Sequence, residues 1–152
     1  MNKKGFSLLE IIIVIAIIGV LSAIAVINFS AAKKAKILET IADGIAFTLE
    51  KAKADAVSGK YGQSHGVKFN TGDYISFVGG SYSAGNASNT VYTIDTAFTI
   101  TNTIADPDDK IVFLRLTGAA NSTATVTVSQ ISDSTKKRDI VIGPLGSISV
   151  VQ

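Results

Sequence analysis

The chain has 152 residues, a mean hydropathy of +0.38 and a formal net charge of +2. Its length leaves room for one small domain, and the absence of cysteine excludes a disulfide framework, thiolate metal ligands and thiol catalysis. Lys3 and Lys4 account for the whole net charge, so the rest of the chain is neutral and is not the strongly basic domain typical of nucleic-acid binding.

The first thirty residues combine these two lysines with a long uncharged run. Glu10 is the last charged residue before Lys33, and the 22 residues between them would extend about 33 Å as an α-helix. That length covers a hydrocarbon core of about 30 Å, so the run predicts a membrane helix. Glu10 lies at the start of the run, where a charge resists entry into lipid, and a plain anchor gives no reason for it.

Two ordinary membrane signals account for only part of this pattern. A cleaved secretory signal would use the small residues around Ala23 as its cleavage site, but such signals have apolar cores of about 7–15 residues and no internal carboxylate. A plain signal anchor, with its N-terminus held in the cytoplasm by Lys3 and Lys4, matches the length and orientation. It leaves Glu10 unexplained.

A third interpretation accounts for the lysines, the carboxylate and the run together. The residues Lys3, Lys4, Gly5, Phe6 and Glu10, with the uncharged run behind them, resemble the prepilin leader of type IV pilins and type II secretion pseudopilins. The resemblance implies that a prepilin peptidase cuts after Gly5 and that the new N-terminus at Phe6 is methylated. It also implies that Glu10 is the assembly residue.

The chemistry of these residues supports the resemblance. Cleavage after Gly5 would create a positively charged amine at Phe6, close in sequence to the Glu10 carboxylate. A buried charge is tolerated when it is paired and is very costly when it is alone, so each amine would seek the carboxylate of a neighbouring helix in a filament. We therefore expect the pair to fix the register of assembly.

The helix lacks one feature of many major pilins. Those proteins carry a proline within the mature helix that kinks or melts it, whereas residues 23–27 of this chain contain none. We therefore expect a helix that runs straight through this region, and a subunit other than the principal one of a pilus.

A helical pattern continues beyond the uncharged run. Apolar residues recur every three or four positions and most charges fall between them, which predicts an amphipathic helix packed on the rest of the chain. Gly59 follows the pattern and is expected to cap the helix at its C-terminus. The apolar stripe consists of Leu38, Ile41, Ile45, Leu49, Ala52 and Ala56.

The sequence after Gly59 is typical of short strands. Runs of β-branched and aromatic residues alternate with polar ones and are separated by Gly, Asn, Asp and Ser, so we predict an α+β fold with one long helix packed on an antiparallel β domain. Gly143–Gly146 is expected to form a tight turn. The expected strands are Gly66–Asn70, Tyr74–Val78, Val91–Asp95, Phe98–Asn102, Ile111–Leu116, Thr123–Ile131, Asp139–Ile142 and Ser147–Val151.

These patterns divide the chain into four expected segments. They are a leader at 1–5, a transmembrane and assembly helix at 6–32, its amphipathic continuation at 33–59 and a globular β domain at 60–152.

The second half of the chain resembles the H-type minor pseudopilins and the FimT-like minor pilins. The resemblance rests on the short strand at His65–Phe69, the run Ile111–Phe113, a polar hairpin and the closing segment Asp139–Val150 with its glycine turn. It implies a pilin-like fold whose β domain has two sheets. It also implies a minor structural subunit of a type IV pilus or a type II secretion pseudopilus.

The same resemblance implies the partners and the location of the chain. The partners would be other pilin or pseudopilin subunits, the prepilin peptidase and the inner membrane, with no cofactor and no small-molecule substrate. Before assembly the chain would be a single-pass protein of the inner membrane. Its N-terminus would be cytoplasmic and its C-terminal domain periplasmic or extracellular, and after assembly it would be part of a filament.

DNA uptake is the alternative function. Some FimT-like proteins bind DNA through arginines near the final strands, but the tail of this chain from Gly146 onward has neither arginine nor lysine. Lys136, Lys137 and Arg138 form the nearest basic cluster and are the candidate DNA-binding residues. The favoured interpretation of the cluster is a solvated hairpin turn, so nucleic acid is not expected as a partner.

Candidate residues for metal binding and catalysis are few. Asp106, Asp108 and Asp109 are the candidate calcium ligands, because clustered carboxylates suit that ion, but their spacing is not that of an EF-hand and a solvated acidic turn is favoured. His65 is the only histidine, and no catalytic triad, phosphate loop or dinucleotide motif stands out. We therefore expect no enzymatic activity, and a signal-anchored extracytoplasmic enzyme is the least favoured function.

Overall fold

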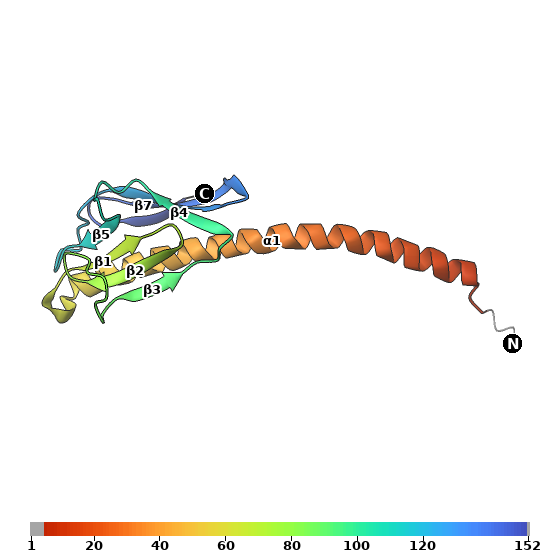
Figure 1. The fold of residues 1–152 in the computed structure, drawn as a ribbon, viewed down its shortest axis with the longest axis horizontal. Helices are drawn as coiled ribbons and strands as arrows, with labels where there is room; N and C mark the ends of the chain where they lie inside the picture. Colours follow the sequence, from red (N-terminus) through yellow and green to blue (C-terminus); the bar gives the residue numbers. More distant parts are fainter. Residues whose placement is uncertain (1–4, 152) are drawn as a thin grey trace. The chain divides into compact units, whose positions relative to one another are not determined.

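The computed structural model describes residues 5–151, apart from the side chains of residues 23–28. The chain divides into two compact units, of which the first ends at Lys36 and the second begins at Ile37. Helix α1 (Leu8–Val57) runs from the first unit into the second (Figure 1). The elements that follow are η1 (Lys60–Gly62), β1 (His65–Phe69), β2 (Asp73–Val78), β3 (Thr90–Thr93), β4 (Phe98–Asn102), β5 (Lys110–Phe113), β6 (Ala124–Gln130), β7 (Asp133–Ile142) and β8 (Ile148–Val151).

Ser7 caps the N-terminus of α1. Its carbonyl accepts hydrogen bonds from the N–H groups of Glu10 at 3.1 Å and Ile11 at 3.3 Å, and its side-chain Oγ accepts one from the N–H of Leu9 at 3.3 Å. A serine in this position satisfies main-chain donors that the first turn of a helix leaves without partners.

Within the described residues, no helix has both the length and the apolarity needed to cross a membrane.

The part of α1 in the second unit buries one face in the core of the β domain. Leu38, Ile45 and Leu49 are buried as predicted, while Ile41 is half-buried and the neighbouring Ala42 is buried. The helix ends at Val57 and is followed by Gly59 in a left-handed conformation (φ 67°), so the predicted C-terminal glycine is confirmed.

The strands form two antiparallel sheets within residues 37–151, which confirms the expected α+β architecture. The first sheet has the order β3-β2-β1-β5 and the second the order β4-β6-β7-β8. Figure 1 shows both sheets beside the later part of α1. A single apolar cluster joins that part of the helix to both sheets, and its fully buried members include Ile45, Leu49, Phe69, Ile111, Phe113, Val126, Val128 and Ile140.

β7 is longer than the sequence predicted. It begins at Asp133 and not at Asp139, because the β6–β7 hairpin continues past the core until Gln130 pairs with Asp133. Residues outside the core need no apolar alternation, so this polar part of the strand was mistaken for a turn. The basic residues 136–138 therefore lie in a strand.

The structure also tests one predicted strand end and one predicted turn. The strand expected at Ile111–Leu116 stops at Phe113, because Leu116 has a left-handed backbone (φ 68°) and its N–H donates to the carbonyl of Ala56 at 2.9 Å. The predicted turn at Gly143–Gly146 is confirmed, since the N–H of Gly146 donates to the carbonyl of Gly143 at 2.9 Å.

Candidate functional site

The predicted processing residues lie ahead of the helix. Gly5 and Phe6 precede the cap residue Ser7, and 80% of the Phe6 surface is exposed. Within the described residues, no atom lies within 4 Å of the position that a Cβ at Gly5 would take. Gly5 and Phe6 are thus both exposed ahead of the helix. The other leader residues, with Lys3 and Lys4, lie outside the described residues.

Glu10 occupies the first turn of α1 and is exposed. Its carboxylate has neither a hydrogen bond nor an ion pair with any described residue. Ser7 and Glu10 have the spacing of a capping box, in which a serine at the N-cap is followed three residues later by a glutamate. The cap at Ser7 was not predicted, although the spacing of Ser7 and Glu10 in the sequence indicates one. The positive end of the helix dipole also favours a carboxylate in this turn.

The helix beyond Glu10 exposes apolar side chains on every side. An exposed helix of a folded protein normally shows one apolar stripe, whereas a helix that is apolar all round is one that becomes buried. An apolar surface of this extent marks contact with lipid or with other protein chains. The main chain of residues 23–27 is helical and belongs to α1, so the helix continues through this region as predicted. The large exposed side chains are Leu8, Leu9, Ile11, Ile12, Ile13, Val14, Ile15, Ile17, Ile18, Val20, Leu21 and Phe29.

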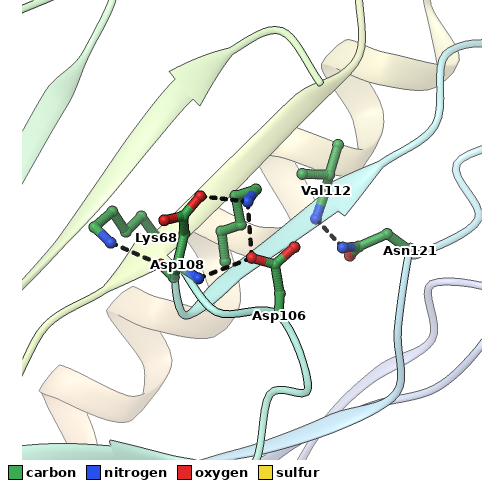
Figure 2. A network of polar contacts seen from close by, with 6 residues as sticks. Lys68, Asp106, Asp108, Val112 and Asn121 are labelled. Atoms are coloured by element: carbon green, nitrogen blue, oxygen red, sulfur yellow. Dashed lines mark hydrogen bonds and ion pairs between the residues drawn. The ribbon is translucent and has the colours of Figure 1, made fainter. Parts of the chain in front are cut away.

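Lys110 occupies the centre of the acidic turn that was the candidate calcium site. Its Nζ lies 2.7 Å from Oδ1 of Asp106 and 2.7 Å from Oδ2 of Asp108, and Lys68 donates to the carbonyl of Asp108 at 2.7 Å (Figure 2). Asp109 contributes its main-chain carbonyl, which accepts from Phe69 N–H at 2.9 Å. Two of the three aspartates therefore converge on an ammonium group. The described residues hold no group of three or more His, Cys, Asp or Glu placed to bind a metal ion.

The ion pairs in this turn change the acidity of their members. The hydrogen bond from Lys110, followed by the one from the main-chain N–H of Asp108, holds the pKa of Asp106 below its usual value. The hydrogen bonds to Asp106 and then to Asp108 raise the pKa of Lys110. Each partner thus favours the charged form of the other. This arrangement links β5 to the loop before it.

The three basic residues on β7 do not form one surface. Side chains alternate between the faces of a strand, so Arg138 lies on the face of the buried Ile140, and Lys137 lies on the opposite face with Asp139. Lys137 Nζ is 3.2 Å from the Asp139 carboxylate, which partly neutralises it. DNA uptake gains no specific support from this arrangement.

His65 has a structural environment. Only 4% of its surface is exposed, and its Nε2 lies 3.1 Å from the carbonyl of Lys60. The imidazole ring therefore links η1 to the start of β1.

A groove of about 500 Å³ lies between the end of α1 and the β7–β8 hairpin. Lys53 lies along it and donates from Nζ to the carbonyl of Gly146 at 2.8 Å. The groove could not be predicted from the sequence, because residues far apart in the chain form it and no local motif indicates it. Its lining consists of Glu50, Lys53, Ala54, Val57, Ser58, Gly146 and Ile148.

Comparison with known proteins gives the context of these features. Residues 1–26 match the family model described as the prokaryotic N-terminal methylation motif. The structure is similar to that of the type IV minor pilin FimU of Pseudomonas aeruginosa, with a TM-score of 0.59 and 18% identity over 76% of this chain and 93% of that chain. It is also similar to the minor pseudopilin EpsH from the type 2 secretion system of Vibrio cholerae, with a TM-score of 0.56 and 12% identity over 75% of this chain and 95% of that chain.

No curated protein shows significant sequence similarity to the chain. The structural similarity extends over nearly the whole length of both solved chains and confirms the predicted pilin-like fold. The chain therefore carries the prokaryotic N-terminal methylation motif in front of a domain with the fold that FimU and EpsH share.

Proposed function

We propose that this protein is a minor structural subunit of a type IV pilus or of a type II secretion pseudopilus. One observation carries the proposal: an exposed helix, apolar on all sides and headed by Glu10, which has no partner among the described residues, is joined to a domain with the fold of FimU and EpsH. Such a helix needs cover from outside the chain, and neighbouring helices in a filament supply it.

Processing would convert the membrane form of the chain into the assembly form. In this proposal the prepilin peptidase cuts between Gly5 and Phe6, and the new amine at Phe6 is methylated. The helix at residues 6–32 then holds the subunit in the inner membrane, with the N-terminus toward the cytoplasm and the β domain on the other side. The uncharged run of 22 residues between Glu10 and Lys33 supports the membrane span, and Lys3 and Lys4 at its N-terminal side support this orientation.

Glu10 would set the register in which helices pack. A carboxylate surrounded by apolar helices and left alone costs about 3–5 kcal/mol relative to the intact buried pair. The amine of Phe6 on an adjacent subunit removes that cost only when the two helices are aligned. Apolar packing along the helix would therefore provide affinity, and the ion pair would select one alignment. No enzymatic step is assigned to the chain.

The substitution Glu10→Ala tests the assembly role. We expect the variant to enter the membrane and to be cleaved normally, but to be missing from sheared filaments or from an assembled pseudopilus. The matched control is Glu50→Ala, which removes an exposed carboxylate from the part of α1 in the second unit. Normal incorporation of the Glu10→Ala variant would overturn the assembly role.

Mass spectrometry of the native protein tests the processing step. The expected N-terminal peptide begins with a methylated Phe6. A protein that keeps its first five residues would contradict the proposal. Deletion of the gene then assigns the machine, since a pilus subunit affects surface pili and a pseudopilin affects secretion of exported proteins.

A further inference from the structure

Ser7 fixes the point at which helix α1 begins. Residues 5–7 are not helical and Leu8 is the first helical residue, so Ser7 is the only residue between Phe6 and the helix. Its side-chain Oγ accepts a hydrogen bond from the N–H of Leu9 at 3.3 Å, and its carbonyl accepts from main-chain N–H groups of the first turn. An N-cap residue makes these bonds with a non-helical backbone, so Ser7 ends the helical conformation directly after Phe6.

Packing within the chain does not hold Gly5 and Phe6 outside the helix. Among the described residues, no atom lies within 4 Å of the position of a Cβ on Gly5, and 80% of the Phe6 surface is exposed. The hydrogen bonds of Ser7 are therefore the contacts that stop the helix here. Without them the helix would be free to begin earlier, because Gly5 and Asn2 are residue types that also cap helices.

A helix that began earlier would include the bond between Gly5 and Phe6. Proteins that recognise a peptide through its main chain commonly hold it as an extended strand, in which N–H and carbonyl groups point sideways toward the partner. In a helix these groups point along the axis and bond to residues one turn away. A peptidase would therefore have to unwind the first turn before it could hold this bond.

We propose that the Ser7 hydroxyl is a positioning group for the removal of the leader, because its cap keeps the bond between Gly5 and Phe6 outside the helix. The proposal rests on the proposed function, which places the cut at this bond. Ser7 takes no part in the chemistry of the cut. It raises the fraction of chains in which a prepilin peptidase can bind the bond, and the apparent dissociation constant equals the intrinsic one divided by this fraction.

The charges of the leader act in the same direction. Lys3 and Lys4 precede the helix in the sequence, and an earlier helix start would bring their ammonium groups into its first turn. The positive end of the helix dipole disfavours cations there. Loss of the cap should therefore lower the fraction of competent chains without reducing it to zero, so we expect slower processing and not a complete block.

The isosteric pair Ser7→Thr and Ser7→Val isolates the hydroxyl. Threonine and valine have nearly the same shape and similar helix propensity, but only threonine can cap. The full-length variants are purified in detergent and cleaved by a purified prepilin peptidase. We expect Ser7→Thr to match the parent, whereas Ser7→Val should raise KM about two- to fivefold and leave kcat unchanged.

Ser22→Val is the matched control within the helix. The Ser22 hydroxyl donates to the carbonyl of Ile18 at 2.7 Å, so this substitution also removes a side-chain bond to the main chain of α1. Ser22 lies about four helical turns beyond the start of α1. The control should therefore leave both KM and kcat unchanged.

Limited digestion with trypsin measures the helix start without the prepilin peptidase. Trypsin recognises the lysine side chain, and the bond after Lys4 is adjacent to Gly5. We expect Ser7→Val, and not Ser7→Thr, to slow trypsin cleavage after Lys4 by a similar factor, because an earlier helix start would include this bond too. Intact-mass spectrometry follows the loss of residues 1–4.

The two proteases give outcomes that separate this role from others. Equal KM values for Ser7→Thr and Ser7→Val would overturn the proposal. A Ser7→Val chain that slows the prepilin peptidase but not trypsin would also overturn it, since the peptidase would then recognise the hydroxyl itself. If the peptidase does not cut the parent after Gly5, the proposed processing fails together with this role, while the trypsin comparison still shows whether Ser7 sets the helix start.

Discussion

Residues 8–22 and residues 37–57 belong to the same helix but have opposite surroundings. In the first stretch, apolar side chains such as Ile15 and Leu21 are more than 60% exposed. In the second, Ile45 and Leu49 have no exposed surface at all. Among the described residues, only the second stretch thus has a hydrophobic partner within the chain. In the proposed function, lipid and then other subunits provide the partner of the first stretch.

Charged groups follow the same division. Glu10 has no partner within the described residues, whereas Asp106 is paired with Lys110 at 2.7 Å. The β domain thus pairs some of its charges internally, as with Asp106 and Lys110, whereas Glu10 has no such pair among the described residues. An unpaired carboxylate is costly only when it becomes buried, so Glu10 costs little until the helix is packed.

The largest effect is expected when a buried residue of α1 is truncated. Leu49→Ala removes a fully buried side chain and leaves a cavity, which should lower the free energy of unfolding of the domain by about 2–5 kcal/mol. Ile15→Ala should leave domain unfolding unchanged, because the side chain is exposed. Urea unfolding followed by near-ultraviolet circular dichroism measures both variants. Equal destabilisation by the two substitutions would mean that the stability of the domain depends on both stretches of the helix.

A smaller effect is expected for the hydroxyl of Tyr74. Burial raises the pKa of this tyrosine, and the side-chain hydrogen bond with Thr48 opposes that rise. Tyr74→Phe should cost about 1 kcal/mol in unfolding free energy, because Thr48 keeps its 2.8 Å bond to the carbonyl of Gly44.

The matched control for this substitution is Tyr92→Phe. The ring of Tyr92 stacks on that of Tyr74 with centroids 5.0 Å apart, and the stack survives the change. Its unfolding free energy should stay within about 0.5 kcal/mol of the parent value. A loss for Tyr92→Phe that equals or exceeds the loss for Tyr74→Phe would contradict a specific stabilising role of the Tyr74 hydroxyl.

Asp106→Asn should lower the stability of the domain at neutral pH slightly and should make that stability less dependent on pH in acid. The folded-state pKa of Asp106 is lowered, so its contribution is fully present above the unfolded value of about 3.9 and is lost as the pH falls through the lower folded value. The melting temperature of the variant should therefore decline less steeply below pH about 4 than that of the parent. Glu10→Ala serves as the comparison and should leave the acid side of the domain's profile unaltered. Parallel profiles for Asp106→Asn and the parent would contradict a stabilising pair.

Sequence patterns predicted those parts of the fold that depend on local chemistry. The helix, its C-terminal glycine, the strand pattern and the turn at Gly143–Gly146 each follow from periodicity or from backbone preferences of single residues. The start of β7 did not follow, because strand pairing with β6 and not apolar alternation extends it to Asp133. The two-sheet arrangement came from a family resemblance.

The site could be predicted only where its residues are neighbours in the sequence. Gly5, Phe6 and Glu10 could be proposed because they lie in one short motif. The role of Lys110 was missed, although it is adjacent to the acidic turn, because composition alone does not show which cation a carboxylate faces. The groove beside β8 depends on contacts between α1 and a hairpin near the other end of the chain, for example Lys53 with Gly146.

Phe47 provides the most delicate test of the comparison between the two stretches. It lies in the stretch that packs on the domain, yet 70% of its surface is exposed. Phe47→Ala should change the unfolding free energy by no more than about 0.5 kcal/mol, because little contact is lost. If the variant also assembles normally, an exposed phenylalanine on this stretch needs no cover and the division of the helix stands. If incorporation into filaments falls while stability is unchanged, the outer face of residues 37–57 belongs to the same assembly surface as residues 8–22, and the need for outside partners extends along the whole helix.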